Sequence, residues 1–212
     1  MLLLFVNSRG IQLTELRLDE SVDGVGARYV PRNFPPVLAD ANWCGASFNR
    51  GLLRIHDSVS GPEAAESVAL AFAGEVSSSV DVVAFDWAGR QFVVDEGAGG
   101  VEGQAHAIYG ADPATGLIEE VADIDEFLLL LQVPEVTAVL QSQRFEQALI
   151  YHGRNSLRFD EVVAVRKPMF FGGEDVPANT EIQDASVYWG LNAQLIREGK
   201  DGAAFRGFRA SE

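Results

Sequence analysis

Cysteine and histidine, which often build metal and nucleophilic sites, are scarce in this sequence. Its 212 residues include one cysteine, Cys44, and three histidines, His56, His106 and His152. A single cysteine forms no intramolecular disulfide, which favours a reducing compartment. The histidines lie far apart, without the H-x-x-x-H spacing or the second cysteine of a usual zinc site. The sequence therefore predicts no disulfide and no metal site, and it predicts that Cys44 is a small buried thiol.

Basic residues are also few. Lys and Arg total 16 against 31 Asp and Glu, which gives a formal net charge of -15 at pH 7. Such a chain is repelled by phosphate backbones and anionic lipids, so the charge opposes direct binding to nucleic acid or to membranes. It attracts a basic protein partner and speeds the encounter. Solubility alone also explains an acidic composition, and charge by itself does not decide between the two.

The sequence has no long apolar run. Residues 1–6 are apolar, but no basic residue precedes them and the run is shorter than a secretory signal requires. The other dense run, residues 127–131, is too short to span a bilayer. We therefore expect residues 1–6 to form a strand, and we expect the protein to be cytoplasmic.

Sequence motifs of catalytic and cofactor sites are missing as well. Residues 45–49, Gly-Ala-Ser-Phe-Asn, do not form a G-x-S-x-G nucleophile elbow. The glycine-rich stretches 97–103 and 172–173 match neither a phosphate-binding loop nor a dinucleotide fingerprint. The acidic residues of 123–126 are explained by the first turn of a helix rather than by a cation site. We predict no catalytic, cofactor-binding or metal-ligating residues, and no enzymatic activity.

Hydrophobic periodicity and turn residues predict the order of elements. A helix begins near Ser60, with Pro62 in its first turn, and others begin at Asp123 and Asp184. We expect a further helix over residues 136–151 with Phe145, Leu149 and Ile150 as core candidates, and Val187, Tyr188, Leu191 and Leu195 pointing inward after Asp184. Strands are expected at residues 51–55, 80–85, 91–94, 104–109, 116–121 and 162–165, several joined as hairpins. This order lacks regular βαβ alternation and predicts an α+β fold.

The domain organisation follows from a stretch rich in glycine and proline, residues 21–42. It marks the boundary between an N-terminal extension, residues 1–46, which includes this stretch, and a main domain, residues 47–199. The last residues, 200–212, are polar and small and form a tail.

Several phrases, taken in order over residues 48–195, resemble the SUKH superfamily of bacterial immunity proteins. The similarity is greatest to the branch found as the C-terminal domain of type VI secretion immunity proteins, often linked to a GAD-like domain. Ala88 departs from the family, which has a larger apolar residue there, and residues 1–46 have no counterpart in it. The matching phrases are Gly51-Leu52-Leu53-Arg54-Ile55-His56, Asp86-Trp87-x-Gly89-Arg90-Gln91-Phe92, Asp112-Pro113-x-Thr115-Gly116, Asp125-Glu126-Phe127, Lys167-Pro168-x-x-x-Gly172-Gly173-Glu174-Asp175, and then Asn179, Asp184 and Val187-Tyr188-Trp189.

The resemblance implies a twisted, mainly antiparallel sheet flanked by helices, and a non-enzymatic protein that binds and neutralises a cognate toxin. The toxin would be a basic protein, such as a secreted effector nuclease. Two alternatives stay open: an acidic scaffold or regulatory protein-binding module, and a small hydrolase using Cys44 or a pair of carboxylates. The hydrolase predicts a deep pocket with convergent titratable groups.

The residues of the family motifs are expected to act mainly in structure. We expect Gly172 and Gly173 to meet a backbone requirement, either a positive φ or close packing. Asp86 and Arg90 flank a turn and are expected to pair with each other or with a partner. The full set is Asp86, Trp87, Gly89, Arg90, Phe92, Pro168, Gly172, Gly173, Glu174, Asp175, Asn179, Tyr188 and Trp189.

Overall fold

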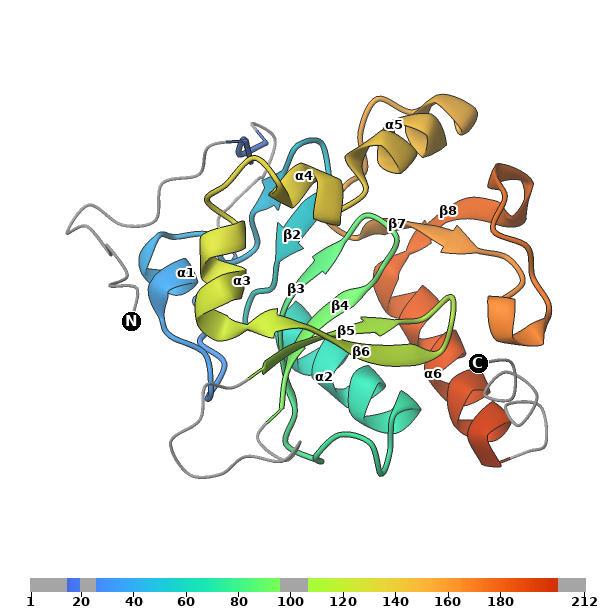
Figure 1. Cartoon of the computed structure of the whole chain (residues 1–212), viewed down its shortest axis with the longest axis horizontal. Helices are drawn as coiled ribbons and strands as arrows, with labels where there is room; N and C mark the ends of the chain where they lie inside the picture. Colours follow the sequence, from blue (N-terminus) through green and yellow to red (C-terminus); the bar gives the residue numbers. More distant parts are fainter. Residues whose placement is uncertain (1–14, 20–25, 96–106, 202–212) are drawn as a thin grey trace.

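An antiparallel sheet forms the centre of the protein. The structure is a computed structural model that describes residues 15–19, 26–95 and 107–201. Within these residues the main sheet has six strands in the order β1-β2-β3-β4-β5-β6, so each strand pairs with the next along the chain. The predicted α+β fold, with an antiparallel sheet flanked by helices, is confirmed (Figure 1). The strands are β1 (Ser47–Phe48), β2 (Leu53–Ile55), β3 (Asp81–Asp86), β4 (Gln91–Val94), β5 (Ala107–Asp112) and β6 (Leu117–Asp123).

Helices cover both faces of this sheet (Figure 1). On one face, α2 (Ser60–Ala71) and α6 (Ala185–Asp201) pack against each other and against the strands. The other face carries α1 (Val37–Asp40), α3 (Ile124–Leu130), α4 (Val136–Val139) and α5 (Ser142–Tyr151), which share a larger apolar core with β2 to β5. The sheet is therefore buried on both sides.

Side chains alternate along β4 between two apolar cores, one on each face of the main sheet. Phe92 and Val94 pack into the larger core, whereas Val93 between them packs against α2 and α6. On the neighbouring strand β3 the register shifts between Val82 and Ala84. Because both faces of β3 and β4 are buried, the central residues of these strands are apolar without alternation. Two such apolar runs on either side of a turn predict the β3–β4 hairpin from the sequence.

A second, two-stranded sheet lies beside the β3–β4 turn. It pairs β7 (Glu161–Val165) with β8 (Thr180–Asp184), and the 3-10 helices η1 (Met169–Phe171) and η2 (Pro177–Asn179) lie in the connection. The N–H of Val163 donates to the carbonyl of Trp87 at 2.8 Å, which joins this sheet to the main one. β7 was predicted, but β8 was not, because its sequence, Thr-Glu-Ile-Gln-Asp, contains a single apolar residue and shows no alternation.

The N-terminal extension packs into the main core where it is described. Leu16, Phe34 and Leu38 are buried in the same cluster as the strands, and Leu18 forms an isolated antiparallel bridge with Phe48. The strand predicted for residues 1–6 lies outside the described residues. Among the residues described, no helix has the length and apolar character needed to cross a bilayer.

The single helix predicted over residues 136–151 is wrong, because the chain breaks it at Gln141, where φ is +54°. The indole N–H of Trp87 donates to the carbonyl of Leu140 at 2.9 Å. In a continuous helix that carbonyl would accept from Arg144, whose N–H instead reaches Gln141 at 2.9 Å. A tertiary contact therefore replaces the helical one and divides the segment into α4 and α5.

Three expected core residues are also exposed. Ile150 is 77% exposed on α5, and Val187 and Leu191 are 55% and 56% exposed on α6. The prediction for Tyr188 is confirmed, since it is 1% exposed, and α6 also buries Trp189, Ala193 and Ile196. The buried face of α6 is therefore shifted by about one residue from the predicted face. In a helix with 3.6 residues per turn, one residue corresponds to a rotation of about 100°.

Replacing Gly173 by alanine tests the close packing of the loop before β8. A Cβ there would lie 1.9 Å from the carbonyl oxygen of Lys167, a backbone atom that cannot move aside without distorting the loop. We expect Gly173→Ala to lower the free energy of unfolding by about 2–3 kcal/mol, measured by urea denaturation.

The matched control is Gly190→Ala in α6, where an added Cβ meets nothing within 4 Å. We expect this change to be neutral or to stabilise by about 0.5–1 kcal/mol, because alanine is the better helix former. Equal stability changes in the two variants would contradict the close packing at Gly173.

Candidate functional site

The structure brings part of the family-motif set together beside the β3–β4 turn. Asp86, Trp87 and Arg90 from this turn meet Asp175 and Tyr188 around a small cavity of about 120 Å³. These residues come from segments that lie up to a hundred positions apart in the sequence. The cavity is a candidate site because motif residues surround it. Whether it can bind a ligand depends on whether its polar groups have hydrogen-bonding capacity left.

Those polar groups are already bonded within the protein. Asp86 Oδ1 accepts the N–H groups of Ala88 and Arg90, each at 3.0 Å, and its Oδ2 lies 3.1 Å from Arg90 Nε. Burial raises the pKa of Asp86, and the nearby Arg90 guanidinium opposes that rise. Of the two roles expected for Asp86 and Arg90, the structure shows the internal pair across the turn.

Asn179 holds the loop that contains Gly173 through hydrogen bonds within the protein. Its side-chain amide donates to the carbonyls of Lys167 and Glu174, at 2.9 and 3.0 Å, and accepts the N–H of Lys167 at 3.0 Å. Gly172 has φ +78°, and Gly173 donates its N–H to the carbonyl of Pro168 at 3.0 Å. The carboxylate of Asp175 pairs with Arg144 on α5.

The aromatic members of the set lie deeper. Trp189 is 1% exposed and donates its indole N–H to the carbonyl of Gly89 at 2.6 Å. Tyr188 is equally buried and packs over Gly89, whose φ is +85°. Phe92 lies in the larger core. In these contacts the motif residues fix turns and helix positions, and their polar groups are used within the fold.

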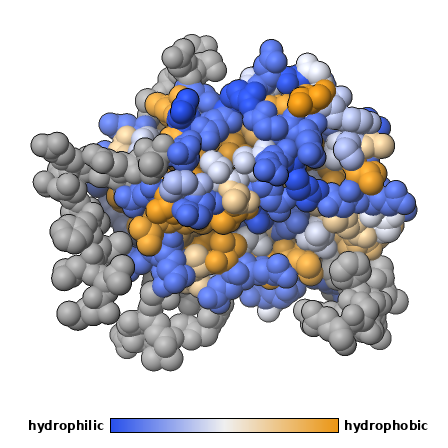
Figure 2. Space-filling view, turned by 45° about the horizontal axis from the view of Figure 1, so that its top comes forward, coloured by the Kyte–Doolittle hydropathy of each residue, from blue (hydrophilic) through white to orange (hydrophobic). Residues whose placement is uncertain are grey.

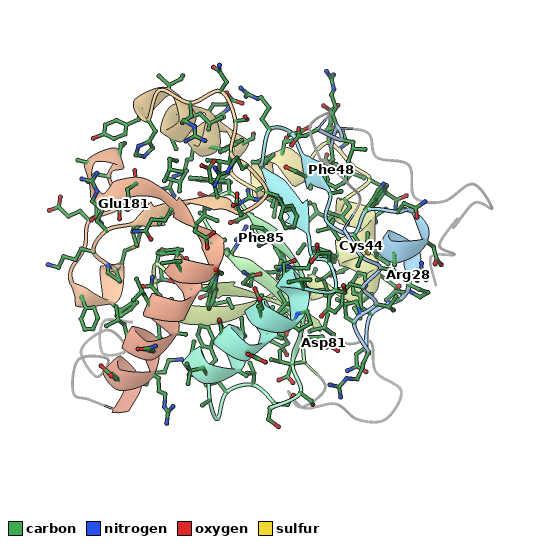
Figure 3. All side chains as sticks on the ribbon, turned by 180° about the vertical axis from the view of Figure 1, so that it is seen from behind. Arg28, Cys44, Phe48, Asp81, Phe85 and Glu181 are labelled. Carbon is green, nitrogen blue, oxygen red and sulfur yellow. The ribbon has the colours of Figure 1, made fainter. Side chains whose placement is uncertain are left out.

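A larger cavity, of about 500 Å³, lies where α2 and α6 begin. We call it the α2–α6 cavity. In the view from behind, Phe85 lies near the middle of the molecule beside these helices, whereas Cys44 lies apart, toward Arg28 and the N-terminal segments (Figure 3). Its lining residues are His56, Ser60, Glu63, Ala64, Glu66, Ser67, Phe85, Gln91, Phe159, Asp160, Asp184, Ala185, Ser186 and Trp189.

Buried polar residues form one part of this lining. His56 and Gln91 are each 3% exposed, and His56 Nε2 lies 2.8 Å from Gln91 Oε1. On the other side of the ring, His56 Nδ1 lies 3.0 Å from Ser60 Oγ. Burial lowers the pKa of His56 from 6.5 to about 4, so the imidazole is neutral at pH 7.

Carboxylates form the exposed part of the lining. Glu63, Glu66, Asp160 and Asp184 line the cavity, and no Lys or Arg is among the described lining residues, although Arg158 Nε lies 3.0 Å from the Asp160 carboxylate. Asp184 also accepts the N–H groups of Ser186 and Val187, which begin α6, so part of its capacity is used there. In the described part of the chain, no three His, Cys, Asp or Glu side chains gather as metal ligands.

The close approach of Ser60 and His56 raises the question of a nucleophile and its base. Ser60 Oγ accepts the N–H of Asp57 at 3.1 Å and lies 3.0 Å from Asp57 Oδ1, an ionised acceptor. Hydrogen bonds from Ser60 and Val59 hold the pKa of Asp57 below its usual range, although partial burial raises it. The single hydroxyl proton of Ser60 thus has two acceptors at 3.0 Å, the ionised Asp57 and, in the tautomer that carries its proton on Nε2, His56 Nδ1. The charged carboxylate is the stronger acceptor and competes with His56 for that proton.

Stabilisation of an oxyanion beside Ser60 is missing from the start of α2. The N–H groups of Ser60, Gly61 and Glu63 are bonded to Asp57 Oδ1, Asp57 O and Val59 O, and Pro62 has none. Cys44, the other nucleophile considered from the sequence, is buried and exchanges hydrogen bonds with the backbone of Tyr29. The cavity contains titratable groups, as the hydrolase alternative requires, but Asp57 and Ser60 bond mainly to each other and to the backbone at the start of α2.

Sequence reasoning missed the α2–α6 cavity. His56, Gln91 and Trp189 each belonged to a motif phrase, yet nothing in the spacing of those phrases showed that the three side chains meet. The remaining residues, such as Glu63 and Glu66, were ordinary helix-surface carboxylates in the sequence. Only the pairing of β2 with β3 and of β3 with β4, and the packing of α6 on α2, place them around one space.

Comparison with known proteins adds little to this geometry. No protein-family description and no curated protein matches the sequence. Among solved structures, the crystal structure of Atu4351 from Agrobacterium tumefaciens is similar to this chain, with 13% identity, a TM-score of 0.49, and coverage of 70% of this chain and 69% of that one.

Acid should destabilise the protein through His56. The unfolded chain binds a proton on this histidine below about pH 6.5, whereas the folded protein does so only near pH 4. Stability from this group is therefore complete above pH 6.5 and is lost as the pH falls to 4, by about 3 kcal/mol. We expect the imidazole signals of His56 in NMR spectra to remain those of the neutral ring at pH 5.

The matched control for the stability measurement is His56→Gln. Its unfolding free energy is expected to fall less steeply between pH 6.5 and 4 than that of the wild type, whatever its stability at pH 7. Parallel pH profiles for the two proteins would show that His56 titrates normally in the folded state.

Proposed function

We propose that this protein is a cytoplasmic, non-enzymatic immunity protein that binds and neutralises a cognate toxin of basic charge. The observation that carries the proposal is the α2–α6 cavity, whose described lining includes four carboxylates, of which Asp160 is paired with Arg158. The ordered phrases that resemble the SUKH superfamily support the same class of function. Membership of that superfamily is part of the proposal.

The charge of the whole chain supports binding to a basic protein. A formal charge of -15 creates a field that accelerates association with a cationic partner and repels nucleic acid. Hydrophilic residues cover much of the face shown in Figure 2, and hydrophobic residues lie between them in smaller groups. A polar surface of this kind suits a complex between two proteins that are each stable alone. Neutralisation then requires only that the surface around the α2–α6 cavity cover the toxin's cationic site.

Co-expression with the product of the neighbouring gene tests the proposal. We expect that gene to encode a toxin whose lethality in a bacterial host is suppressed when this protein is expressed with it. The two proteins should co-purify as a stoichiometric complex. Because charge contributes to recognition, the dissociation constant should rise as salt is increased. Failure of both protection and co-purification would contradict the proposed function, and capture of housekeeping proteins would favour a scaffold or regulatory module.

The hydrolase alternative has its own assay, the turnover of p-nitrophenyl esters by the purified protein. We expect wild-type protein and Ser60→Ala to give the same rate, because Asp57 competes with His56 for the Ser60 proton and the nearby N–H groups are occupied. A rate that falls by about tenfold or more in Ser60→Ala, equivalent to about 1.4 kcal/mol in activation free energy, would favour catalysis by Ser60.

A further inference from the structure

The two edges of the main sheet differ in how they are covered. At one edge, β1 has two residues and the segment before it lies alongside, with the N–H of Asp19 donating to the carbonyl of Ser47 at 2.9 Å and Leu18 bridging Phe48. At the other edge, β6 is the outer strand beyond β5 (Figure 1). Its seven residues make it the longest strand among the described residues. The edge of β6 is therefore the place where a further strand can be added.

Backbone groups on the outer side of β6 have no partner in the described part of the chain. No described residue outside β5 forms a hydrogen bond with the backbone of residues 118–122. The pairing with β5 is regular from Leu117 to Glu120, and a register shift then leaves Val121 without a partner on β5. A bulge of this kind interrupts regular pairing, so the part of the edge that can accept a strand is residues 117–120.

Side chains along residues 117–120 are apolar at the start and acidic at the end. Leu117 is 38% exposed, Ile118 is half-buried, and Glu119 and Glu120 are exposed. Neither glutamate forms an ion pair with a described residue. Successive side chains on a strand point to opposite faces, so a strand added here meets one carboxylate on each face of the sheet.

A second copy of β6 is a poor partner for this edge. Each antiparallel alignment that pairs at least three of residues 117–120 with their copies sets a glutamate opposite another glutamate or opposite an apolar residue. Like charges directly opposite each other are destabilising, and charges on edge strands commonly act against pairing between copies. Opposite charges at the same positions are stabilising. The carboxylates of Glu119 and Glu120 therefore favour a strand that carries basic residues.

We propose that the edge of β6 at residues 117–120 docks an extended segment of the basic partner protein, which adds a further strand to the main sheet. The segment continues the antiparallel order of the sheet, with two basic residues opposite Glu120 and Glu119 and two apolar residues opposite Ile118 and Leu117. Backbone hydrogen bonds along the edge supply affinity, and the order basic, basic, apolar, apolar supplies specificity.

This docking edge is separate from the α2–α6 cavity, whose described lining contains no residue of β6. The proposal rests on the proposed function for the identity of the partner as the toxin. The docking edge itself is testable without the toxin, because a short peptide reproduces the segment that it binds.

The test is a titration of the full-length, isotope-labelled protein with the peptide acetyl-Thr-Arg-Lys-Val-Val-Thr-amide, followed by NMR. We expect saturable shifts of the backbone amides of residues 117–120, with a dissociation constant on the order of 1 mM. The peptide acetyl-Thr-Glu-Glu-Val-Val-Thr-amide has the same length and acidic residues in place of the basic ones. It should bind about tenfold more weakly, because like charges then lie opposite each other.

Methylation of peptide nitrogens separates strand addition from attraction between charges. In an antiparallel pair only alternate residues direct their N–H groups to the neighbouring strand. One modified peptide carries N-methyl groups on Arg and the first Val, and the other carries them on Lys and the second Val. We expect one of these two peptides to lose binding, because its methyl groups face β6, and the other to retain it.

Two double variants with equal charge test the glutamates of the docking edge. Glu119→Gln with Glu120→Gln should weaken binding of the basic peptide about fivefold, as the loss of two cross-strand charge pairs allows. Glu135→Gln with Glu198→Gln, both exposed and outside β6, should leave the affinity unchanged.

Several results would overturn the docking edge. These are equal binding of the basic and acidic peptides, equal effects of the two methylation patterns, unaltered affinity in the Glu119/Glu120 variant, or amide shifts centred outside β6. A dimer of this protein formed through β6 would also overturn it, in favour of a second copy. If the Glu119/Glu120 variant binds and neutralises the toxin as well as wild type, the proposed function stands and the docking edge fails. If the peptides bind as expected but no toxin is neutralised, the docking edge stands and the proposed function fails.

Discussion

The arrangement of the protein depends on one buried cation, Arg54. Its side chain is fully buried, and its guanidinium donates to the carbonyls of Gly51 and Glu161, joining β2 to the second sheet at β7. Burial lowers the pKa of Arg54 to about 10, while nearby carboxylates such as Asp86 and Asp19 raise it, so it stays charged at pH 7. A buried charge is expensive unless hydrogen bonds and nearby opposite charges compensate it, and the two carbonyl partners of Arg54 constrain where β7 can lie.

The position of Arg54 also sets up the α2–α6 cavity. Its guanidinium lies over Phe85, and the Phe85 ring stacks on His56 with centroids 4.8 Å apart. His56 in turn holds Gln91 and Ser60. A series of contacts thus connects Arg54, which lies between the two sheets, to the polar residues of the cavity. Scaffold and candidate binding site are neighbours in this protein, and the family-motif residues belong mainly to the scaffold.

Local signals in the sequence were strong enough to identify most elements. Asp123 and Glu126 form a capping box, with Glu126 N–H donating to Asp123 at 2.7 Å, so the start of α3 is encoded within four residues. Turn residues and apolar runs located both hairpins of the main sheet. These features depend on neighbours in the chain, so periodicity and turn chemistry suffice to predict them.

Long-range contacts decided what local signals could not. Helix 136–151 divides because the Trp87 indole takes the carbonyl of Leu140, a contact across 53 positions. The inward face of α6 was misjudged because apolar residues occur on two of its sides, and only packing on α2 selects between them.

The sequence by itself determined the α+β class, the acidity, the absence of usual zinc and nucleotide motifs, and the positions of the tight turns. Each of these is a property of composition or of a few adjacent residues. Only the tertiary structure decided that His56, Gln91, Glu63 and Trp189 surround one cavity. It also decided how their polar atoms are bonded, because hydrogen-bond partners and buried charges are supplied by segments that are distant in the chain.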